Sequence, residues 1–542
     1  MGDEDQEKMV GETEESAPLV AEKRIVSSDD LIEELVRNRS WKYTGLVMSL
    51  MIVWLGGPTT LYLTSFAGID PKETNTWVCK SEKCLNLTTA NSSILEVFPC
   101  KMIEIVDGKE ELVLEAADIE WKLNHTSFSA EFDLYCDVGS RKAQKTLLSS
   151  IYFAGALTGL IIGGYLLDKI GRKKSAIIGI VIGGGALLAG IFCHSYFLLL
   201  AMRYFIGLGN YLTSTAMYIL TVELVTAKPR NLLNGWTGLM WALGYPIAAA
   251  VGYFVTDWNY MFLAALIVFL LSTIQVFVCI ESPRFYLMNN DVAAAKAAFQ
   301  ALADLSNFDM ELEKVEISDE SKAKELEQST KQQLIDLIKY PALRLETAML
   351  MMLWTFVAMF YYGFNFGWEA LAPDMYLGYV MGGVGEIIAY ALTIPLIAWL
   401  GRRRAMAVMF VGAALSYLLA IPDVPILGEY SMENIMCLLG IVFVSGTFSG
   451  VYMWTTEIAP TSHVGLVFCL SSGSARIGSF IGPYIFNNLY PKTHKAVPLG
   501  LLAVIAVVCV LGSFLLVETG DKTMALTPQD IEERRKGYKH QI

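Results

Sequence analysis

Three charged side chains stand alone inside long apolar runs of this chain, and their types could do chemistry there. Arg203, Glu386 and Arg476 lie well inside runs that are otherwise free of Asp, Glu, Lys and Arg. A charge at the centre of a lipid bilayer costs roughly 2.5–3.5 kcal/mol on lenient insertion scales, so each needs a partner or a wet cavity. Glu386 and Arg476 sit near the middle of their runs, whereas Arg203 lies closer to one end.

The pair of opposite charges at mid-run allows two interpretations. The planar fork of Arg476 suits a carboxylate, and Glu386 suits a cationic group, so the two would hold the ends of a small organic ion. Alternatively, they form a mutual salt bridge that only fixes helix packing. The sequence leaves both interpretations open.

Aromatic residues at helical spacing accompany these charges. Trp354, Tyr361 and Tyr362 are spaced i, i+7 and i+8, and Trp241 and Tyr245 are spaced i and i+4, so each set shares a helical face. Their rings attract ammonium groups by cation–π contact, worth about 0.5–2 kcal/mol each. The alternative for any one of them is simple packing.

The composition indicates that these residues belong to a membrane protein. Hydrophobic residues are 54% and charged residues 18% of 542, with mean hydropathy +0.44, against roughly 45–50% and about 25% in soluble chains. A soluble enzyme is excluded. No basic patch with interleaved aromatics suggests nucleic acid, and no HExxH, P-loop or GxSxG motif suggests a catalytic or metal site.

The elements that must position the charges are apolar runs long enough to cross a bilayer of roughly 30 Å. Twelve such runs are present, three of them with one internal charge: 43–66, 146–167, 175–195, 196–222, 231–256, 258–280, 347–368, 375–400, 405–421, 434–456, 464–489 and 497–517.

The loop charges predict the orientation of the spans, because short cytosolic loops are enriched in Lys and Arg. With the N-terminus inside, nine basic residues fall in short inner loops and two in short outer loops. The acidic N-terminal segment has no signal-peptide pattern, so it is expected to be a cytosolic tail, with the C-terminus on the same side.

This orientation places residues 68–145 outside the cell, and their chemistry agrees. The segment has four cysteines (Cys79, Cys84, Cys100 and Cys136) and three glycosylation sequons (Asn86, Asn91 and Asn124). Two disulfides are expected, with three pairings open, and four free thiols are the alternative.

We therefore expect five regions. They are a cytosolic tail (1–42), a first six-helix half (43–280) that carries the ectodomain, a cytosolic linker with amphipathic helices (281–346), a second six-helix half (347–517) and a cytosolic tail (518–542). The two halves echo each other at offsets of 230–237: Gly171-Arg172 with Gly401-Arg402, Glu223 with Glu457, and Glu281 with Glu518. Two related halves around a mid-membrane cavity are typical of alternating-access carriers.

The stretch GYLLDKIGRKKS (Gly164–Ser175) resembles the signature loop of the major facilitator superfamily. The resemblance implies an all-α fold of twelve membrane helices. It also implies a conformational latch in which Asp168 sits by the start of the eleventh helix and Arg172 reaches Glu223, locking the outward-facing state. In the second half Ala398 replaces the acid. The residues assigned to the latch by this resemblance are Gly164, Asp168, Gly171, Arg172, Glu223, Arg230, Glu281, Arg284, Arg402 and Glu457.

Further motifs resemble the organic cation, organic anion and carnitine transporter family between about residues 40 and 520. They are TVELVTAKPR, ALGYPIAAAVGYFVTDW, ESPRFYL, LWTFVAMFYYG and SARIGSFIGPY, with the long Cys-rich loop after the first span. ESPR is shared with sugar carriers, whereas the long loop is not. Family ectodomains usually hold six cysteines and this one has four.

The family pattern narrows the choice of substrate class. Cation members tend to have an acid where Arg476 stands, anion members tend to have a lysine where Tyr390 stands, and carnitine-type members pair Glu386 with Arg476. The resemblance implies a polyspecific carrier of zwitterionic or carnitine-like ions, held by Arg476, Glu386 and the rings of Trp354, Tyr361, Tyr362, Trp241, Tyr245 and Tyr390. An organic anion exchanger is the alternative within the family, and a non-transporting receptor or scaffold is the alternative of another class.

The cellular membrane and the energy source stay open at this stage. A glycosylatable ectodomain predicts the plasma membrane, whereas EESAPLV (Glu14–Val20) loosely resembles an acidic dileucine signal and leaves the endolysosomal membrane as the alternative. No cofactor is expected, and neither Na⁺ nor H⁺ coupling can be chosen. The oligomeric state is equally open.

Overall fold

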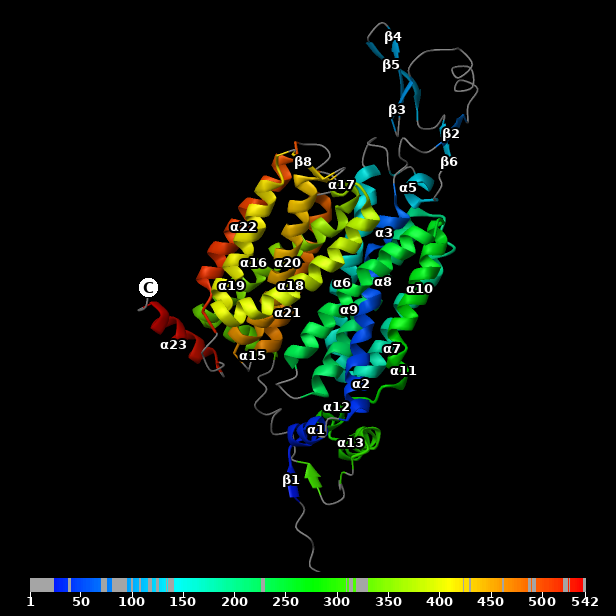
Figure 1. The fold of residues 1–542 in the computed structure, drawn as a ribbon. Helices are drawn as coiled ribbons and strands as arrows, with labels where there is room; N and C mark the ends of the chain where they lie inside the picture. The colour runs from blue at the N-terminus through cyan, green and yellow to red at the C-terminus, as the bar shows by residue number, and fades with distance from the viewer. Residues whose placement is uncertain are drawn as a thin grey trace, which may run out of the picture.

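Long helices aligned in one bundle make up the computed structural model (Figure 1). It describes residues 24–37, 40–69, 76–79, 95–98, 101–106, 109–115, 119–122, 126–132, 134, 141–225, 230–308, 310, 315–317, 330–422, 424–427, 430–460, 463–485, 489, 494–519, 525 and 527–539. Everything below concerns these residues.

The first half of the bundle begins with three helical segments in direct succession, α2 (Trp41–Leu50), η1 (Met51–Leu55) and α3 (Gly56–Ala67). The helices that follow are α6 (Arg141–Ile170), α7 (Arg172–Gly190), α8 (Tyr196–Glu223), α9 (Arg230–Phe254), α10 (Trp258–Thr273) and α11 (Gln275–Val278).

The second half has long helices in the corresponding order. They are α16 (Pro341–Phe366), α18 (Met375–Leu400), α19 (Arg402–Leu419), α20 (Met432–Ile458), α21 (Val464–Tyr484) and α22 (Ala496–Leu515), with the short α17 (Trp368–Leu371) after α16.

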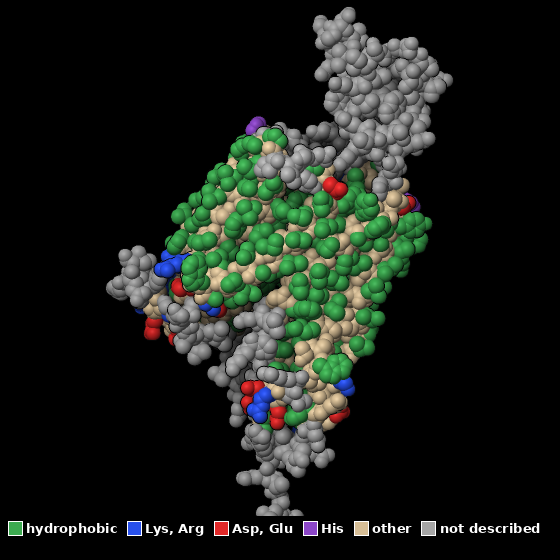
Figure 2. Space-filling model, in the orientation of Figure 1, with side chains coloured by type: hydrophobic (Ala, Val, Ile, Leu, Met, Phe, Trp, Pro, Cys, Tyr) green, Lys and Arg blue, Asp and Glu red, His purple; other side chains and the backbone are tan. Residues whose placement is uncertain are grey.

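Nine helices of the described chain are long and apolar enough to cross a membrane. They cover nine of the twelve expected runs, and α8, α9 and α19 occupy the other three as helices. Figure 2 shows hydrophobic side chains in a broad belt over the visible face, with charged side chains gathered near its ends. A surface that faces lipid must be apolar over such a belt. Together with the nine described helices that can span a membrane, the belt indicates a multi-pass membrane protein.

One end of the bundle, called here the basic end, carries the loops after α6 and α18 with Arg172 and Arg402. Below the first half lie α1 (Ser28–Arg37), α12 (Pro283–Met288), α13 (Val292–Ser306) and a parallel pair of strands, β1 (Arg24–Val26) and β7 (Val315–Ile317). The Ala-rich stretch of the linker forms α13, which buries Phe299 and Leu302 against its neighbours.

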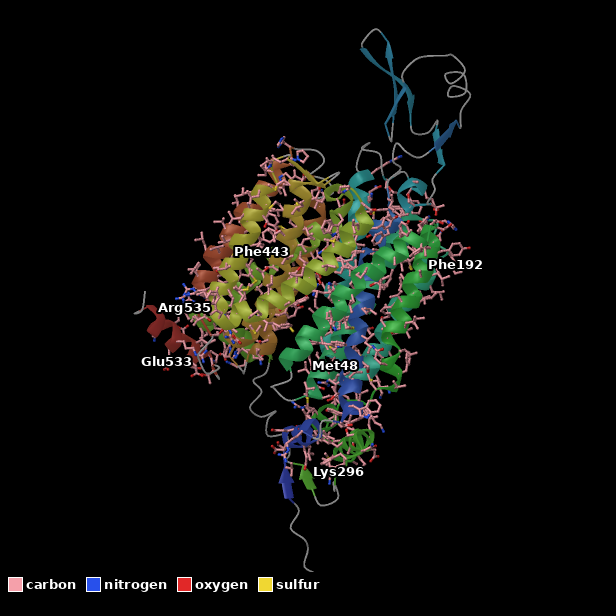
Figure 3. The ribbon with its side chains drawn as sticks, viewed as in Figure 1. Met48, Phe192, Lys296, Phe443, Glu533 and Arg535 are labelled. Carbon is pink, nitrogen blue, oxygen red and sulfur yellow. The ribbon has the colours of Figure 1, made fainter. Side chains whose placement is uncertain are left out.

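Two further helices lie at the basic end of the second half, α15 (Thr330–Lys339) and α23 (Pro528–Lys539). Arg535 of α23, labelled in Figure 3, donates to Glu346 of α16 at 2.5 Å, and Glu532 accepts a hydrogen bond from the backbone of Ala342 at 2.6 Å. The C-terminal helix is therefore bound to the first turns of α16.

The segment expected to be an ectodomain lies at the opposite end and contains strands, so the all-α class describes the membrane bundle and not this segment. An antiparallel pair joins β2 (Thr76–Cys79) to β6 (Ile119–Lys122), and a three-stranded sheet joins β3 (Leu95–Phe98), β4 (Lys101–Val106) and β5 (Lys109–Glu115). Cys84, Cys100, Cys136, Asn86, Asn91 and Asn124 fall outside the described residues, so the disulfides and glycosylation stay predictions.

The two halves meet mainly near the strand-bearing end. Tyr379 of α18 donates to Ser65 of α3 at 2.8 Å, and Tyr376 stacks on Phe66. At the basic end, by contrast, Asp168 is 70% exposed and a Cβ added to Gly164, Gly235 or Gly465 would meet nothing within 4 Å. Among the described residues, the two halves are therefore in contact near the strand-bearing end and less closely packed at the basic end.

Candidate functional site

The carboxylate of Glu386 lies at the centre of the bundle with none of its side chain exposed. It projects from the middle of α18, and its Oε1 accepts hydrogen bonds from the hydroxyl of Tyr245 on α9, at 3.1 Å, and from that of Tyr361 on α16. Its Oε2 has no hydrogen-bond partner among the described residues. One oxygen of this buried carboxylate is therefore hydrogen-bonded to the described part of the protein, and the other is not.

A network of hydroxyl groups surrounds this acid. Tyr361 accepts a hydrogen bond from the indole of Trp241 at 2.7 Å and lies 2.6 Å from the Tyr245 hydroxyl, which in turn lies 3.0 Å from that of Tyr62. These groups come from α3 and α9 in the first half and α16 in the second. In a water-poor interior such a network replaces the hydration of the charge.

The guanidinium of Arg476 occupies a second buried position, on α21, with 6% of the residue exposed. Its Nη1 donates to the hydroxyl of Tyr211 on α8 at 2.8 Å, and its Cζ lies 4.3 Å from the centre of that ring. Its Nε has no hydrogen-bond partner among the described residues. The Tyr211 hydroxyl lies 3.5 Å from that of Tyr362.

The mutual salt bridge considered from the sequence is not formed in the described structure. Arg476 is paired with Tyr211, and Glu386 with Tyr245 and Tyr361. The two charges are linked only through adjacent tyrosines, since the rings of Tyr361 and Tyr362 are 4.9 Å apart. Glu386 and Arg476 therefore do not neutralise each other in this structure.

The other two aromatic candidates lie at the edge of this arrangement. Trp354 is buried, donates its indole hydrogen to Thr455 at 2.9 Å and packs against the ring of Tyr452 at 4.4 Å. Tyr390 is half-buried one helical turn from Glu386, and a Cβ at Gly238 would lie 2.7 Å from its ring. Because Gly238 has no side chain, the Tyr390 ring can pack directly against this part of α9.

The latch residues of the first half form a compact cluster at the basic end. Gly171, at φ 99°, turns the chain from α6 into α7. Arg172 is 4% exposed and donates to Glu223 at 2.8 Å, and the backbone N–H groups of Arg172 and Lys173 donate to Glu281 at 3.1 and 3.0 Å. A carboxylate at a helix N-terminus is favoured by the free N–H groups and by the helix dipole.

The second half repeats this cluster. Gly401, at φ 78°, joins α18 to α19, and Arg402 donates twice to Glu457 at 2.9 Å. Glu518 accepts hydrogen bonds from the backbone of Arg402 and Arg403 at 3.0 Å. The three sequence matches at offsets of 230–237 are therefore three matching contacts in space.

Comparison with known proteins gives the family. The sequence profile described as the Major Facilitator Superfamily matches residues 126–483, about two thirds of the chain. The chain belongs to this superfamily. Its members are transporters, so the protein is a transporter and not an enzyme.

Curated relatives refine the placement within the superfamily. The chain is 27% identical to a "Solute carrier family 22 member 15-like" protein of Xenopus laevis, over 79% of this chain and 86% of that one. It is 25% identical to the human "Organic cation/carnitine transporter 2", over 84% and 80%. Rabbit "Solute carrier family 22 member 6" is 26% identical over 77% and 76%. The chain is a distant homologue of this solute carrier family.

A solved superfamily member has the same fold. The "Inward open conformation of the xylose transporter XylE from E. coli" superimposes with a TM-score of 0.60 at 14% identity, covering 91% of this chain and 99% of that one. At this identity the likeness concerns the fold alone.

The superfamily signature also assigns Asp168, Arg284 and Arg230 to the latch. Asp168 is exposed, and its ion partner is Arg172 at 3.5 Å, in its own half. Arg284 lies on α12, and Arg230 begins α9 with its side chain outside the description. The Arg172–Glu223 contact that the resemblance implies is formed, and its role as a conformational lock stays a prediction.

Arg203, the third charge inside a span, belongs to a separate region. It is fully buried and donates to the backbone carbonyls of Thr60 at 2.6 Å and Leu61 at 2.8 Å, while its Cζ lies 5.0 Å from the ring of Tyr152. These contacts join α8 to α3 and α6 within the first half. The packing interpretation therefore fits Arg203.

Sequence reasoning missed the tyrosines of the first half that complete the site. Tyr211 is the hydrogen-bond partner of Arg476, and Tyr62 extends the network around Glu386. Asn210–Tyr211 is a polar pair in the middle of the run 196–222, which was a usable signal. Tyr62 stands in a run rich in polar and small residues, so it had no comparable signal.

Proposed function

We propose that the chain is a polyspecific organic ion transporter that works by alternating access and takes zwitterionic or carnitine-like substrates. Twelve membrane spans in two related halves would move about the central site. The carboxylate of the substrate would bind Arg476, and its ammonium end would bind Glu386 and the surrounding rings. No cofactor takes part, and a coupling ion, Na⁺ or H⁺, remains to be identified by experiment.

The observation that carries this proposal is a pair of buried opposite charges that do not neutralise each other. Glu386 and Arg476 each pair with tyrosine hydroxyls and each keep one polar atom without a partner in the described chain, Oε2 and Nε respectively. A buried ion without a counter-ion is costly. A substrate with two opposite ends would supply both missing partners at once.

The aromatic groups support the cationic end of this assignment. Tyr361, Tyr245 and Trp241 border the Glu386 carboxylate. Their rings favour an ammonium group by cation–π attraction, worth about 0.5–2 kcal/mol each. The name of the human relative, an organic cation/carnitine transporter, agrees with such a substrate.

An organic anion exchanger is the second candidate. It is favoured by the tyrosine network itself, which donates to Glu386 and could satisfy this acid without a substrate cation. Arg476 would then be the only charge that recognises the substrate. A receptor or scaffold that carries no flux is the candidate of another class.

For the cellular setting we propose the plasma membrane, with both termini in the cytosol and residues 68–145 outside. The basic end is then the cytosolic end, and the structure corresponds to an inward-facing state. Asp168 would reach the start of α21 only when this end closes. The endolysosomal membrane is the alternative location.

The test is uptake of three labelled probes by cells that express the protein: carnitine, tetraethylammonium and an aromatic carboxylate, each with and without sodium. Carnitine uptake that is lost in both Arg476→Ala and Glu386→Ala supports the two-ended site. Glu433→Ala is the matched control, because Glu433 pairs with Lys495 at 3.0 Å away from the central site. Surface labelling confirms that each variant reaches the membrane.

Other outcomes identify the alternatives. Uptake of the aromatic carboxylate alone, abolished by Arg476→Ala and unchanged by Glu386→Ala, makes the protein an anion carrier and contradicts the zwitterion assignment. Asp168→Ala separates a carrier from a scaffold, because a carrier should stall whereas a scaffold should keep its partners.

A further inference from the structure

A hollow on the outside of the bundle lies away from the central site. It has a volume of about 500 Å³ and lies at the basic end of the first half, lined by residues from the end of α6, the start of α7 and α12. The residues that line it are Lys169, Ile170, Lys174, Ile177, Ile178 and Phe285. Neither the transport proposal nor the latch uses this hollow.

The lining divides into a charged part and an apolar part. Two lysines line the hollow, Lys169 from the last turn of α6 and Lys174 from the first turn of α7. Ile178 follows Lys174 by one helical turn, so charge and apolar surface are about 5 Å apart along α7. The ligand that fits must have an anionic group joined to apolar chains.

The two lysines differ in how they are held. The amine of Lys169 donates to the hydroxyl of Tyr165 at 2.9 Å and lies 5.2 Å from the centre of that ring, which fixes its direction. Lys174 is exposed, and among the described residues its amine has neither a hydrogen bond nor an ion pair. One ammonium group is therefore already hydrogen-bonded within the protein, and the other is available to a ligand.

The hollow lies at the ends of two membrane-spanning helices, so in a bilayer it would face the lipid headgroups. α6 ends and α7 begins at this level, and both are helices long and apolar enough to cross a membrane. Tyr165 and Ile178 are exposed on the surface that would face lipid. Lysines at such a boundary extend their charged ends to the headgroup region while their stems contact apolar chains.

We propose that this hollow binds the headgroup of an anionic phospholipid, with the phosphate between Lys169 and Lys174 and an acyl chain along Ile177 and Ile178. Anionic lipids attract basic side chains at the membrane surface. A soluble phosphate would use the two lysines but leave the apolar part of the hollow uncovered. The lipid accounts for both parts.

The position of the hollow connects the lipid to the latch. Phe285, which lines the hollow, has its ring 5.4 Å from the Cζ of Arg172 and within 3.2 Å of the Cβ position of Gly171. A bound lipid would therefore press on the residues that hold the Arg172–Glu223 pair. Occupancy should stabilise the first half and change the rate at which the basic end opens and closes.

The second half offers a matched control. At the offset of 230 that relates the two halves, Arg404 corresponds to Lys174, but Trp399 corresponds to Lys169. One cation and an exposed indole replace the two ammonium groups. Removal of Arg404 deletes the same charge from the same kind of helix end without touching the hollow.

The experiment is native mass spectrometry of the full-length protein in nanodiscs of phosphatidylcholine, alone or doped with phosphatidylserine. We expect the wild type to retain bound phosphatidylserine. Lys169→Gln and Lys174→Gln should each weaken phosphatidylserine binding about fivefold, because each basic side chain contributes a similar attraction to anionic lipid. Arg404→Gln should retain it. Lipid binding is measured without any transported substrate, so failure of the transport proposal would not affect this result.

Three results would overturn the lipid site: equal retention of phosphatidylcholine, equal loss in Arg404→Gln, or displacement of phosphatidylserine by inorganic phosphate at matched concentration. The last would assign the lysines to a free anion. A melting curve for each variant separates lost binding from lost folding. If a lysine variant does not fold, the wild-type preference between the two lipids and its weakening by salt decide the question.

Discussion

The two halves of the molecule are nearly equivalent at the basic end and different at the centre. At the basic end each half has a glycine at positive φ, an arginine paired with a glutamate, and a second glutamate on a helix N-terminus. At the centre both charges, Glu386 and Arg476, come from the second half. The first half supplies hydroxyls and rings, among them Tyr211 and Tyr245.

This difference separates two tasks. In the transport cycle proposed above, the two halves move about the central site, and the repeated contacts at the basic end would give each half the same turn between its helices. Recognition of an ion requires charges in one fixed arrangement. If the first half repeated the charges of the second half, like charges would face each other across the central site. The first half therefore contributes polar groups that orient the charges of the second half. The following variants test how far this division holds.

The largest effect should come from the two latch arginines. Arg172 is 4% exposed against 24% for Arg402, while Glu223 and Glu457 are similarly exposed at 15% and 17%, so Arg172→Ala removes the more deeply buried guanidinium. Removal of one partner from a buried pair costs about 3–5 kcal/mol, whereas a partly exposed pair is worth about 1 kcal/mol. We expect a larger fall in melting temperature in detergent for Arg172→Ala than for Arg402→Ala. Equal losses would mean that the two latches are equivalent in energy as well as in geometry.

The next effect concerns the glycines that precede these arginines. Gly171 and Gly401 have ψ values of 165° and 171° at positive φ, a region essentially limited to glycine, and a substitution there costs about 1–3 kcal/mol. An added Cβ would lie 2.4 Å from the Glu281 carboxylate but 3.1 Å from that of Glu518. Gly171→Ala should therefore lower surface expression and melting temperature more than Gly401→Ala. The reverse order would show that the second hinge is the more constrained one.

A smaller effect should appear at the centre, where the first half supplies hydroxyls. Tyr211→Phe removes the hydrogen-bond partner of Arg476 while keeping the ring beneath its guanidinium. A hydrogen bond to a charged group is worth enough to expect about a tenfold loss of affinity for a carboxylate-bearing probe. Tyr245→Phe should instead weaken the binding of probes with an ammonium group, because the Tyr245 hydroxyl donates to Glu386. Competition assays with both probes give the two values, and equal weakening by both variants would contradict a two-ended site.

Much of the basic end could be predicted from the sequence, because the residues that meet there stand in local patterns that recur in both halves. A glycine followed by an arginine between two apolar runs predicts a tight turn, and a repeat of that pattern predicts the same turn in the other half. The partners Glu223 and Glu457 were also within reach, since each stands at the end of an apolar run at a matching offset.

The central site was less predictable, because its geometry depends on how helices rotate against each other. Glu386 and Arg476 were identifiable as isolated charges, but the distance between them was not, and a mutual salt bridge stayed open as the alternative. The tyrosine partners decide this question, and they come from helices whose facing surfaces the sequence does not specify. Trp354 illustrates the same limit: its spacing matched Tyr361, yet its indole is used by Thr455.

The smallest effect concerns a contact at the start of α21. His463, buried beside that start, lies 3.6 Å from Asp336 of α15. Burial lowers the pKa of His463 below its ordinary value of about 6.5, and Asp336 opposes this. The unfolded chain therefore binds this proton more readily than the folded one.

Stability from His463 is then complete above pH of about 6.5 and is lost as the pH falls below that value. His463→Asn should flatten the dependence of melting temperature on pH in this acidic range. His194→Asn is the control, since His194 is exposed and pairs with Glu131 at 3.2 Å. If His463→Asn keeps the slope of the wild type, the link between α15 and α21 does not titrate. The start of α21 would then be held by packing alone.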